Sequence, residues 1–332
     1  MSGETVALCI VTHDSAADLP GCLAAVADLD HRPIEIVVVD SASRDGSLDA
    51  ARENAPPGVP LTTVGFAENV GVAAGRNAAI ARTAAPFILT LNADAHLSPG
   101  CVTRLLARVA RHPEMRVGAV AARLLRPADE SGETRLDACG MRLTPTWRHL
   151  DRGSGEIDRG QFGQAEKVFG ATGAASLFRR EALADAAVDG EIFDPRFHSF
   201  REDAELCFRL RERGWEVLYE PAAVAVHRRF NLPERRAAMP AHVNFHSLKN
   251  RYLLRLYHQT GRNLLRTFLP TAVRDVAALG HTLLRERSSL PAYAWLWRHR
   301  AEILRRRRSI QERRTVPAAA LDRWFYRDGE PV

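Results

Sequence analysis

Short apolar blocks and longer amphipathic stretches alternate along the first 125 residues of the chain. The apolar blocks are rich in Val, Ile and Leu, and between them apolar residues recur every three or four positions. Continuous apolar runs predict strands buried on both faces, and the intervening spacing predicts helices. The predicted strands cover 6–12, 34–39, 61–64, 87–91 and 117–121, and the predicted helices 14–27, 45–54, 72–82 and 101–111. This alternation indicates βαβ units and a parallel sheet.

The pattern breaks between residues 126 and 166, where the chain is charged, rich in glycine and poor in apolar residues. Such composition predicts a surface insertion or a flexible loop. Regular spacing then resumes. It predicts ordered structure over 168–178, helices over 180–187 and 203–213, and short strands at 217–219 and 222–226 around Pro221.

Beyond Pro240 the chain becomes basic and amphipathic. The spacing of apolar residues predicts helices over 243–257, 263–287 and 292–314. The whole chain has a formal net charge of +6, but residues 244–332 hold 18 Lys/Arg and 7 Asp/Glu, a net of +11. We therefore expect a first domain over 1–240 and a basic helical extension over 241–332, which suits an anionic partner such as a membrane surface or nucleic acid.

Several classes of protein are disfavoured by what the sequence lacks. The five cysteines are odd in number and never spaced as C-x-x-C, which argues against a disulfide framework or a structural zinc site and fits a reducing cytosol. We see no basic leader at the N-terminus and no apolar run of about 18 residues. No G-x-G-x-x-G follows the first strand, which disfavours dinucleotide oxidoreduction. We expect a cytoplasmic protein, soluble or peripheral on the inner face of the membrane.

Candidate chemistry lies where predicted strands end, which is where open α/β sheets bind ligands. Asp40 follows the second strand, and a carboxylate there can accept a hydrogen bond from N3–H of uracil or thymine. Ser43 and Asp45 follow closely, although either could simply cap the next helix. Further along, Gly71 and Arg76 belong to a glycine-containing helix start that could approach a diphosphate.

Two further segments carry carboxylates. Asp94 ends the segment Asn92-Ala93-Asp94 after a buried strand, and would be a hard oxygen ligand for Mg²⁺ or Mn²⁺. Glu202 and Asp203 open a helix, where a carboxylate can act as a general base or merely complement the helix dipole. His227 follows a strand and could complete a metal shell, although a lone histidine is more often not a ligand.

These four segments, in this order, resemble the family 2 inverting glycosyltransferases of the GT-A fold, over roughly residues 5–230. The motifs that carry the resemblance are V-V-D-x-x-S-x-D-G-S, E-N-x-G-x-A-x-G-x-N, N-x-D, and F-D-x-x-F followed by E-D-x-x-L-C-x-R-L and G-W-x-V-x-Y-x-P-x-A-x-V-x-H. The chain is most similar to the bacterial branch with rhamnosyltransferases of cell-envelope polysaccharide assembly. The resemblance implies an α/β, Rossmann-like, mainly parallel sheet flanked by helices, to which the basic helical extension is added.

The resemblance also implies roles for individual residues. Asp203 would be the base, with Glu202 beside it, and Asp94 and His227 would hold Mg²⁺ or Mn²⁺. The implied nucleotide-sugar contacts are Thr12, Asp14, Asp40, Ser43, Asn69, Gly71, Arg76 and Asn92. The chain departs from the family pattern at two places. Asn92 replaces the first carboxylate of D-x-D, and Thr12-His13-Asp14 replaces T-Y-N.

The implied function is inverting transfer of a sugar from a dTDP- or UDP-linked donor, with rhamnose one candidate, to a hydroxyl of a glycan or lipid-linked acceptor in cell-envelope polysaccharide synthesis. The alternative is a catalytically inactive GT-A scaffold or peripheral membrane protein. The presence together of Asp40, Asp94, Asp203 and His227 weighs against that alternative.

The basic extension has its own competing interpretations. Trp295 and Trp297 lie close to the arginine run 305–308, which favours an interfacial amphipathic helix over a nucleic-acid site. We therefore expect the segment 262–314 to dock on an anionic membrane. The alternative is that these helices pack on the catalytic body or on the second subunit of a homodimer.

Overall fold

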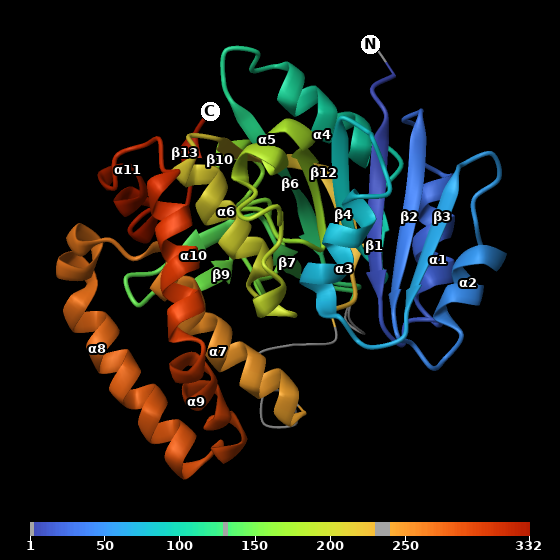
Figure 1. Ribbon diagram of the computed structural model, residues 1–332. Helices are drawn as coiled ribbons and strands as arrows, with labels where there is room; N and C mark the ends of the chain where they lie inside the picture. The colour runs from blue at the N-terminus through green and yellow to red at the C-terminus, as the bar shows by residue number, and fades with distance from the viewer. Residues whose placement is uncertain (1–2, 129–131, 230–239) are drawn as a thin grey trace.

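A large mixed sheet forms the centre of the computed structural model, which describes residues 3–128, 132–229 and 240–332 (Figure 1). Within these residues eleven strands join one sheet. Its main path runs through β13 (Glu330–Pro331), β10 (Glu166–Lys167), β12 (Glu216–His227), β6 (Val117–Leu125) and β11 (Ala175–Arg179), and then through β4, β1, β2 and β3. The strands of its first half are β1 (Val6–Thr12), β2 (Ile34–Ser41), β3 (Leu61–Phe66) and β4 (Phe87–Asn92), all parallel. The predicted parallel sheet is confirmed.

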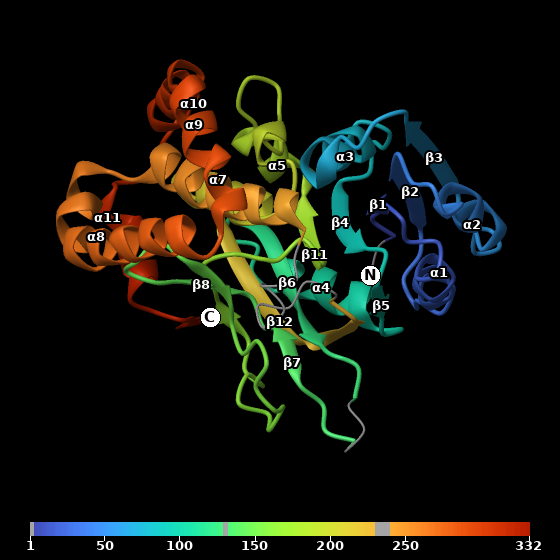
Figure 2. The same ribbon diagram turned by 90° about the horizontal axis from the view of Figure 1, so that it is seen from below.

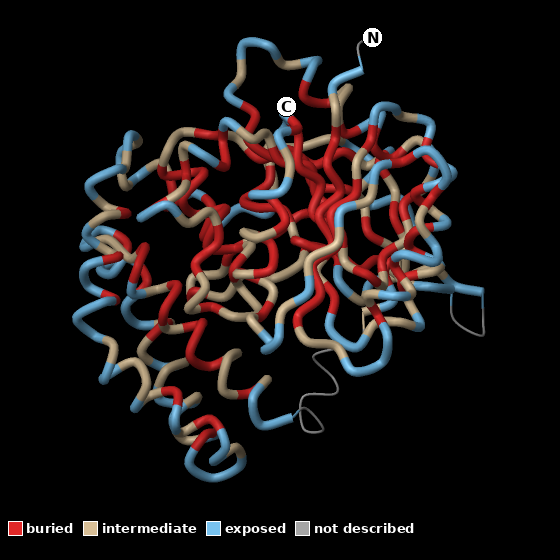
Figure 3. The backbone as a smooth tube through the Cα atoms, turned by 45° about the vertical axis from the view of Figure 1, so that its right-hand side comes forward, coloured by how far each residue is buried: buried red, intermediate tan, exposed pale blue. Residues whose placement is uncertain are grey.

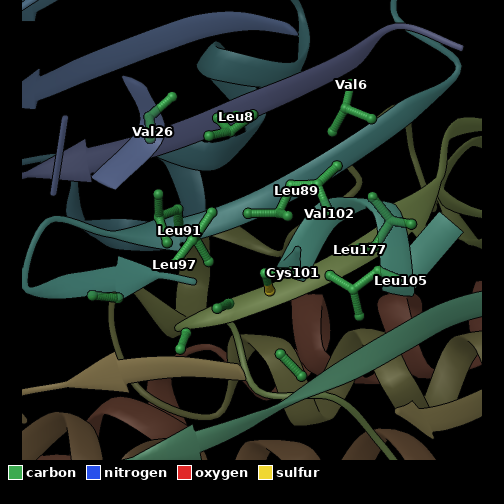
Figure 4. Packing of buried hydrophobic residues seen from close by; sticks show 14 of the residues in the cluster. Val6, Leu8, Val26, Leu89, Leu91, Leu97, Cys101, Val102, Leu105 and Leu177 are labelled. Carbon is green, nitrogen blue, oxygen red and sulfur yellow. The ribbon is translucent and has the colours of Figure 1, made fainter. Parts of the chain in front are cut away.

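Side chains of successive strand residues enter two different cores, as the period of two requires. In β1, Val6, Leu8 and Ile10 belong to one buried cluster with residues of α1 (Leu19–Ala27) and α4 (Cys101–Ala110). Figure 4 labels Val6 and Leu8 in this cluster, together with Val26 of α1 and Val102 of α4. The alternate residues of the same strand belong to the cluster that contains α3 (Gly71–Ile80), α5 (Arg180–Ala186) and α6 (Glu202–Glu212). The buried residues therefore lie along the sheet, through the middle of the molecule (Figure 3). The remaining helix of this half, α2 (Ser47–Glu53), comes after β2 in the chain.

The second half of the sheet is mixed and brings distant segments to the end of β4. β11 (Ala175–Arg179) lies antiparallel between β4 and β6 (Val117–Leu125), and β12 (Glu216–His227) runs parallel to β6. β12 is one strand through Pro221, where we predicted two, because an irregularity between Glu220 and Val224 accommodates the proline. β5 (Ala95–Leu97) pairs with the end of β12 and sets Ala95 opposite His227.

The segment 126–166 differs from our expectation of a surface insertion or flexible loop. Its described residues form β7 (Leu136–Ala138), β8 (Met141–Leu143), β9 (His149–Asp151) and the start of β10 (Glu166–Lys167). Leu136, Asp137, Cys139 and Met141 are each about 1% exposed or less. The strands are too short to give a periodic signal, and contacts with β6 and the C-terminal helices bury them.

The C-terminal part packs on the rest of the chain (Figure 2). Its helices are α7 (Ala241–His258), α8 (Gly261–Leu284), α9 (Pro291–Arg298), α10 (Arg300–Glu312) and α11 (Ala319–Asp322). A third core joins Tyr257, Ile303 and Trp324 from this part to Phe197 and Phe208 from the first part of the chain. The part is not wholly helical, since β13 (Glu330–Pro331) pairs with β10. The expected boundary near residue 240 adjoins 230–239, which lie outside the described residues.

Two of the four arginines in the run 305–308 of α10 make internal contacts, whereas Arg305 and Arg308 are exposed. Arg306 is 1% exposed, donates to the carbonyl of Val188 and lies 3.0 Å from Glu191. Arg307 donates to the carbonyls of Leu256 and Gln259, near the end of α7. These two arginines therefore attach α10 to its neighbours instead of presenting charge to a membrane.

Buried ion pairs also join α6 to α7. Glu205 is fully buried, bonds Arg209 at 2.6 Å and lies 3.6 Å from His258 of α7. Burial by itself would raise the pKa of Glu205, but Arg209 and His258 lower it to about 2.

Within the described residues, none of the helices is both long enough and apolar enough to cross a bilayer.

Candidate active site

The loops that follow β1 and β2 surround Asp40, which is 7% exposed. Ser43 donates to this carboxylate through both its hydroxyl and its backbone N–H. The backbone N–H of Asp14 donates to the Ser43 hydroxyl at 2.9 Å. Thr12 is buried at the end of β1, opposite Asp40, and its Oγ1 meets no hydrogen-bond partner within the described residues. Thr12, Asp14, Asp40 and Ser43 are thus brought together.

Asn69 and Gly71 lie beside this loop, at the start of α3. Asn69 accepts from the Ser41 hydroxyl at 3.1 Å and from the Gly71 N–H at 2.9 Å. Gly71 has a φ of +76°, and a Cβ there would stand 2.6 Å from His198. Only glycine allows this close approach, which links the start of α3 to the loop before α6.

Arg76 occupies a different place from the one we expected. We predicted that it pairs with a diphosphate, but it is 4% exposed and donates to Glu202 Oε1 and to the carbonyl of Gly173, both at 2.8 Å. It lies inside the protein because Glu202, 5% exposed, needs a buried cation beside it. Arg76 therefore supports the start of α6 from within.

The two carboxylates at the start of α6 have different environments. Burial, followed by the neighbouring charge of Asp203, raises the pKa of Glu202 to about 7 despite the Arg76 ion pair. Asp203 is only partly buried. Its Oδ2 accepts from the Gly173 N–H at 2.9 Å, and its Oδ1 accepts from the Ala204 N–H at 2.8 Å. Asp203 is thus oriented by backbone donors.

A second carboxylate site lies at the end of β4. His227 Nε2 is 3.2 Å from Asp94 Oδ1 and 3.3 Å from the Asn92 amide. The other ring nitrogen, Nδ1, is 2.7 Å from Asp137 Oδ2, and Asp137 is 1% exposed. The pairing of β5 with β12 places His227 between these two carboxylates.

The charge of His227 is governed by these neighbours. Burial opposes the imidazolium, but hydrogen bonds to Asp137 and Asp94 raise the pKa of His227 to about 9. Burial likewise would raise the pKa of Asp94, and the hydrogen bond with His227 holds it below its ordinary value. The group is therefore an ion-paired unit.

The residues present fit a divalent cation in part. The Asp94 oxygen and the His227 nitrogen converge, and the Asp137 carboxylate fixes the ring from its other side, as carboxylates commonly do for metal-bound histidines. Within the described part of the chain, no group of three or more His, Cys, Asp or Glu side chains could hold a metal ion by itself. A cation here would thus take its remaining ligands from diphosphate oxygens and water.

Arg229 joins Asp137, the partner of His227, to Asp151. Its guanidinium bonds Asp137 at 3.1 Å and Asp151 at 2.7 Å. Burial raises the pKa of Asp151, Arg229 opposes this rise, and the charges of Asp137 and Asp203 add to it. Arg229, Asp137 and Asp151 were not among the residues predicted for the site, because the strands that carry the two carboxylates have only three residues each and give no periodic signal.

The chain before α6 is held in an unusual conformation. His198, Phe200 and Arg201 all have φ between +60° and +72°, although none is glycine. Asn250 of α7 donates to the carbonyls of Phe197, Ser199 and Phe200, at 2.7 to 2.8 Å. Residues of this kind persist only where neighbours hold them, and they cluster at functional sites. Sequence periodicity carries no signal for this contact.

The parallel half-sheet, the mixed second half and the carboxylates at the strand ends are those of a GT-A glycosyltransferase. The family model of glycosyl transferase family 2 matches residues 7–186, more than half of the chain. The chain therefore belongs to glycosyl transferase family 2, which confirms the resemblance seen in the sequence.

Curated relatives agree with this assignment. N-acetylglucosaminyl-diphospho-decaprenol L-rhamnosyltransferase of Mycobacterium tuberculosis is 28% identical over 235 residues, which cover 65% of this chain and 74% of the relative. An N-acetylglucosaminyltransferase of Mesorhizobium japonicum is 29% identical over 219 residues, 64% of this chain and 48% of the relative.

Two solved structures share the fold. The mannosyltransferase PcManGT from Pyrobaculum calidifontis, in complex with GDP-Man and Mn²⁺, has a TM-score of 0.53 at 19% identity, covering 98% of this chain and 89% of that one. Residues 1–349 of S. aureus TarS, in complex with UDP-GlcNAc, have a TM-score of 0.56 at 14% identity, covering 93% and 90%. At these identities the likeness concerns the fold alone.

Proposed function

We propose that this chain is an inverting glycosyltransferase that moves a sugar from a dTDP- or UDP-linked donor to a hydroxyl of a lipid-linked or glycan acceptor in cell-envelope polysaccharide synthesis. The name of the mycobacterial relative, which specifies rhamnosyl transfer to a lipid diphosphate, supports rhamnose as a candidate sugar. Uracil and thymine present the same N3–H, so the Asp40 carboxylate would accept a hydrogen bond from either base. The five buried free thiols fit a cytoplasmic location.

The contrast between Glu202 and Asp203 carries this proposal. Glu202 is buried against Arg76, whereas Asp203 is partly exposed and held by two backbone N–H groups. A general base must reach the substrate hydroxyl, and its orientation must be fixed. Asp203 meets both conditions. Glu202 does not meet the first one, because it is buried against Arg76 and a substrate hydroxyl cannot reach it.

In the proposed reaction Asp203 accepts the proton of the acceptor hydroxyl as its oxygen attacks the anomeric carbon. The bond from that carbon to the diphosphate breaks in the same displacement, so the configuration inverts. No protein nucleophile takes part. Asp40, Ser43 and Thr12 would bind the nucleobase side of the donor.

Asp94 and His227 would hold Mg²⁺ or Mn²⁺, with Asn92 beside them. Such an ion supplies positive charge to the diphosphate leaving group. Asp137 would fix the orientation of the His227 ring by binding Nδ1, so that Nε2 points toward Asp94. The Mn²⁺ in the complex of the Pyrobaculum mannosyltransferase supports this ion type.

A donor screen tests the proposal. The purified chain is incubated with UDP- and dTDP-linked sugars, Mn²⁺ and a lipid-diphosphate saccharide, and nucleoside diphosphate release is measured. We expect one donor to be turned over and NMR of the product to show an inverted anomeric centre. A retained configuration would contradict the mechanism, and no turnover with any donor would favour the catalytically inactive scaffold.

A further inference from the structure

α8 is amphipathic in the reverse of the usual sense. Its buried side chains are the polar residues Asn263, Thr267, Thr271 and Thr282. Its large apolar side chains face outward instead: Leu264, Leu265, Phe268, Leu269, Val273, Val276, Leu279, Leu283 and Leu284 are all exposed. A helix on the surface of a water-soluble domain normally turns its apolar stripe to the core. The exposed apolar side of α8 therefore needs another apolar surface to cover it.

The exposed residues form one continuous surface. Leu265, Leu269, Val276, Leu279 and Leu283 recur at spacings of three, four and seven residues and so share one side of the helix. We call these five residues the α8 apolar stripe. The stripe runs from Leu265 to Leu283 of this 24-residue helix and therefore extends along about 27 Å. Leu265 is 83% exposed and Val276 74%.

Specific contacts fix the rotation of α8. Trp147 Nε1 donates to Thr267 Oγ1 at 3.2 Å, and Thr271 Oγ1 donates to the carbonyl of Pro145 at 3.2 Å. Asn263 donates to Asp322 at 3.3 Å. Turning the stripe inward would break these hydrogen bonds and bury apolar side chains against polar partners. The helix also lies along the outer edge of the molecule, away from β1 to β4 (Figure 1).

Positive charge stands at both ends of the stripe. Arg262 and Arg266 lie in the first turns of α8 and share one carboxylate, Asp322. Arg285 and Arg287, both exposed, follow its last residue. The acidic residue within the helix, Asp275, is neutralised by Arg251 and Arg255 of α7. The stripe and its flanks are therefore apolar and cationic.

We propose that the α8 apolar stripe docks on an anionic lipid bilayer, with the helix lying in the plane of the interface. Apolar side chains would enter the acyl boundary, and the flanking arginines would meet lipid phosphates. A second copy of the chain suits this surface less well. Whether two α8 helices pack parallel or antiparallel, arginine-bearing ends meet arginine-bearing ends.

This inference refines the membrane segment expected from the sequence. The docking element is α8, whereas Arg306 and Arg307 of α10 serve internal contacts. It rests on the proposed function in one respect: a bilayer-bound enzyme would meet a lipid-linked acceptor where that acceptor is embedded. Binding to lipid itself requires neither donor nor acceptor, so the two ideas can fail separately.

The test is co-sedimentation of the full chain with vesicles of equal parts phosphatidylglycerol and phosphatidylcholine, against phosphatidylcholine alone, at low and high salt. The variant Leu265→Glu/Val276→Glu places charge in the stripe, and Leu265→Ser/Val276→Ser is a milder second form. Leu304→Glu, at a residue of α10 that is 57% exposed, is the matched control. Donor turnover with a water-soluble acceptor and thermal unfolding are measured for every form.

We expect salt-sensitive binding to the anionic vesicles, a loss of at least ~10-fold in both stripe variants, and near wild-type binding for Leu304→Glu. Unfolding temperature and turnover should stay unchanged in the stripe variants. Absence of wild-type binding at low salt, or equal binding by the stripe variants, would overturn the proposal. So would a stable wild-type dimer that the same substitutions convert to a monomer. Vesicle binding without any turnover would instead contradict the proposed function alone.

Discussion

Asn250 offers a sharp test of how the C-terminal part supports the site, because it acts on Asp203 only through the backbone. Its amide donates to three carbonyls of the segment 197–200, directly before Glu202 and Asp203. Replacement by alanine removes all of these contacts at once. Asn250→Asp keeps the shape but replaces the donor with an acceptor that the carbonyls repel.

The size of the effect follows from the contacts. A hydrogen bond contributes about 1 kcal/mol net, and buried carbonyls left unpaired add to the loss, so we expect Asn250→Ala to lower the free energy of unfolding by about 2–4 kcal/mol. The left-handed residues His198, Phe200 and Arg201 would then relax. A displacement of Asp203 by about 1 Å would lower kcat on the order of 10²-fold.

The assay combines urea unfolding with donor and acceptor kinetics, measured at a temperature where each variant is fully folded. We expect kcat to fall while KM for the donor changes little, because Asp40 and Asp94 lie on other elements. Asn54→Ala, at an exposed asparagine after α2, is the control and should leave both quantities unchanged. If Asn250→Ala lowered stability but kept kcat within about threefold of wild type, the positioning argument would be wrong.

Four further predictions concern single carboxylates. Asp203→Asn should lower kcat on the order of 10²–10⁴-fold with donor affinity retained, as measured by calorimetry; near-normal turnover would move the base elsewhere. Asp94→Ala should abolish turnover, and chelator should do the same to the wild type until Mn²⁺ or Mg²⁺ is restored; full activity in excess chelator would refute the metal role. Asp137→Asn should lower activity on the order of 10–100-fold and raise the metal concentration for half-maximal rate, which an unchanged metal titration would contradict. The pKa of Glu205 lies below its ordinary value of 4.5, at about 2, so its ion pair stabilises the fold fully above pH 4.5 and progressively less as the pH falls toward 2. The free energy of unfolding should therefore decline over that window, and Glu205→Gln, although less stable at neutral pH, should show a shallower decline; equal slopes would contradict the assignment.

Much of the catalytic part could be predicted from local pattern. Strands buried on both faces are continuous apolar runs, so β1, β2 and β4 can be predicted from the sequence. Ligands bind where parallel strands end, and this makes Asp40 and Asp94 recognisable candidates from the amino-acid sequence alone. The ordered set of these motifs also leads to the correct family.

The sequence could not reveal which charged groups meet inside the protein. Arg76 and Glu202 are 126 residues apart, and the order of the strands, not a local repeat, brings them together. The same holds for Asp137, which reaches His227 from a segment that looked unstructured, and for Asn250, which reaches the loop before α6 from another helix. Each pairing depends on tertiary packing.

The C-terminal helices show which features the sequence determines and which ones only the tertiary structure decides. Apolar spacing predicted an amphipathic helix over 263–287, because such a helix presents one apolar side at a period of 3.6 residues, and the structure has this helix over Gly261–Leu284. Spacing does not say whether that side faces the core or the exterior. Only the tertiary structure decides this: hydrogen bonds from Trp147 and to Pro145 occupy the polar side of α8 and leave Leu265 and Val276 outside.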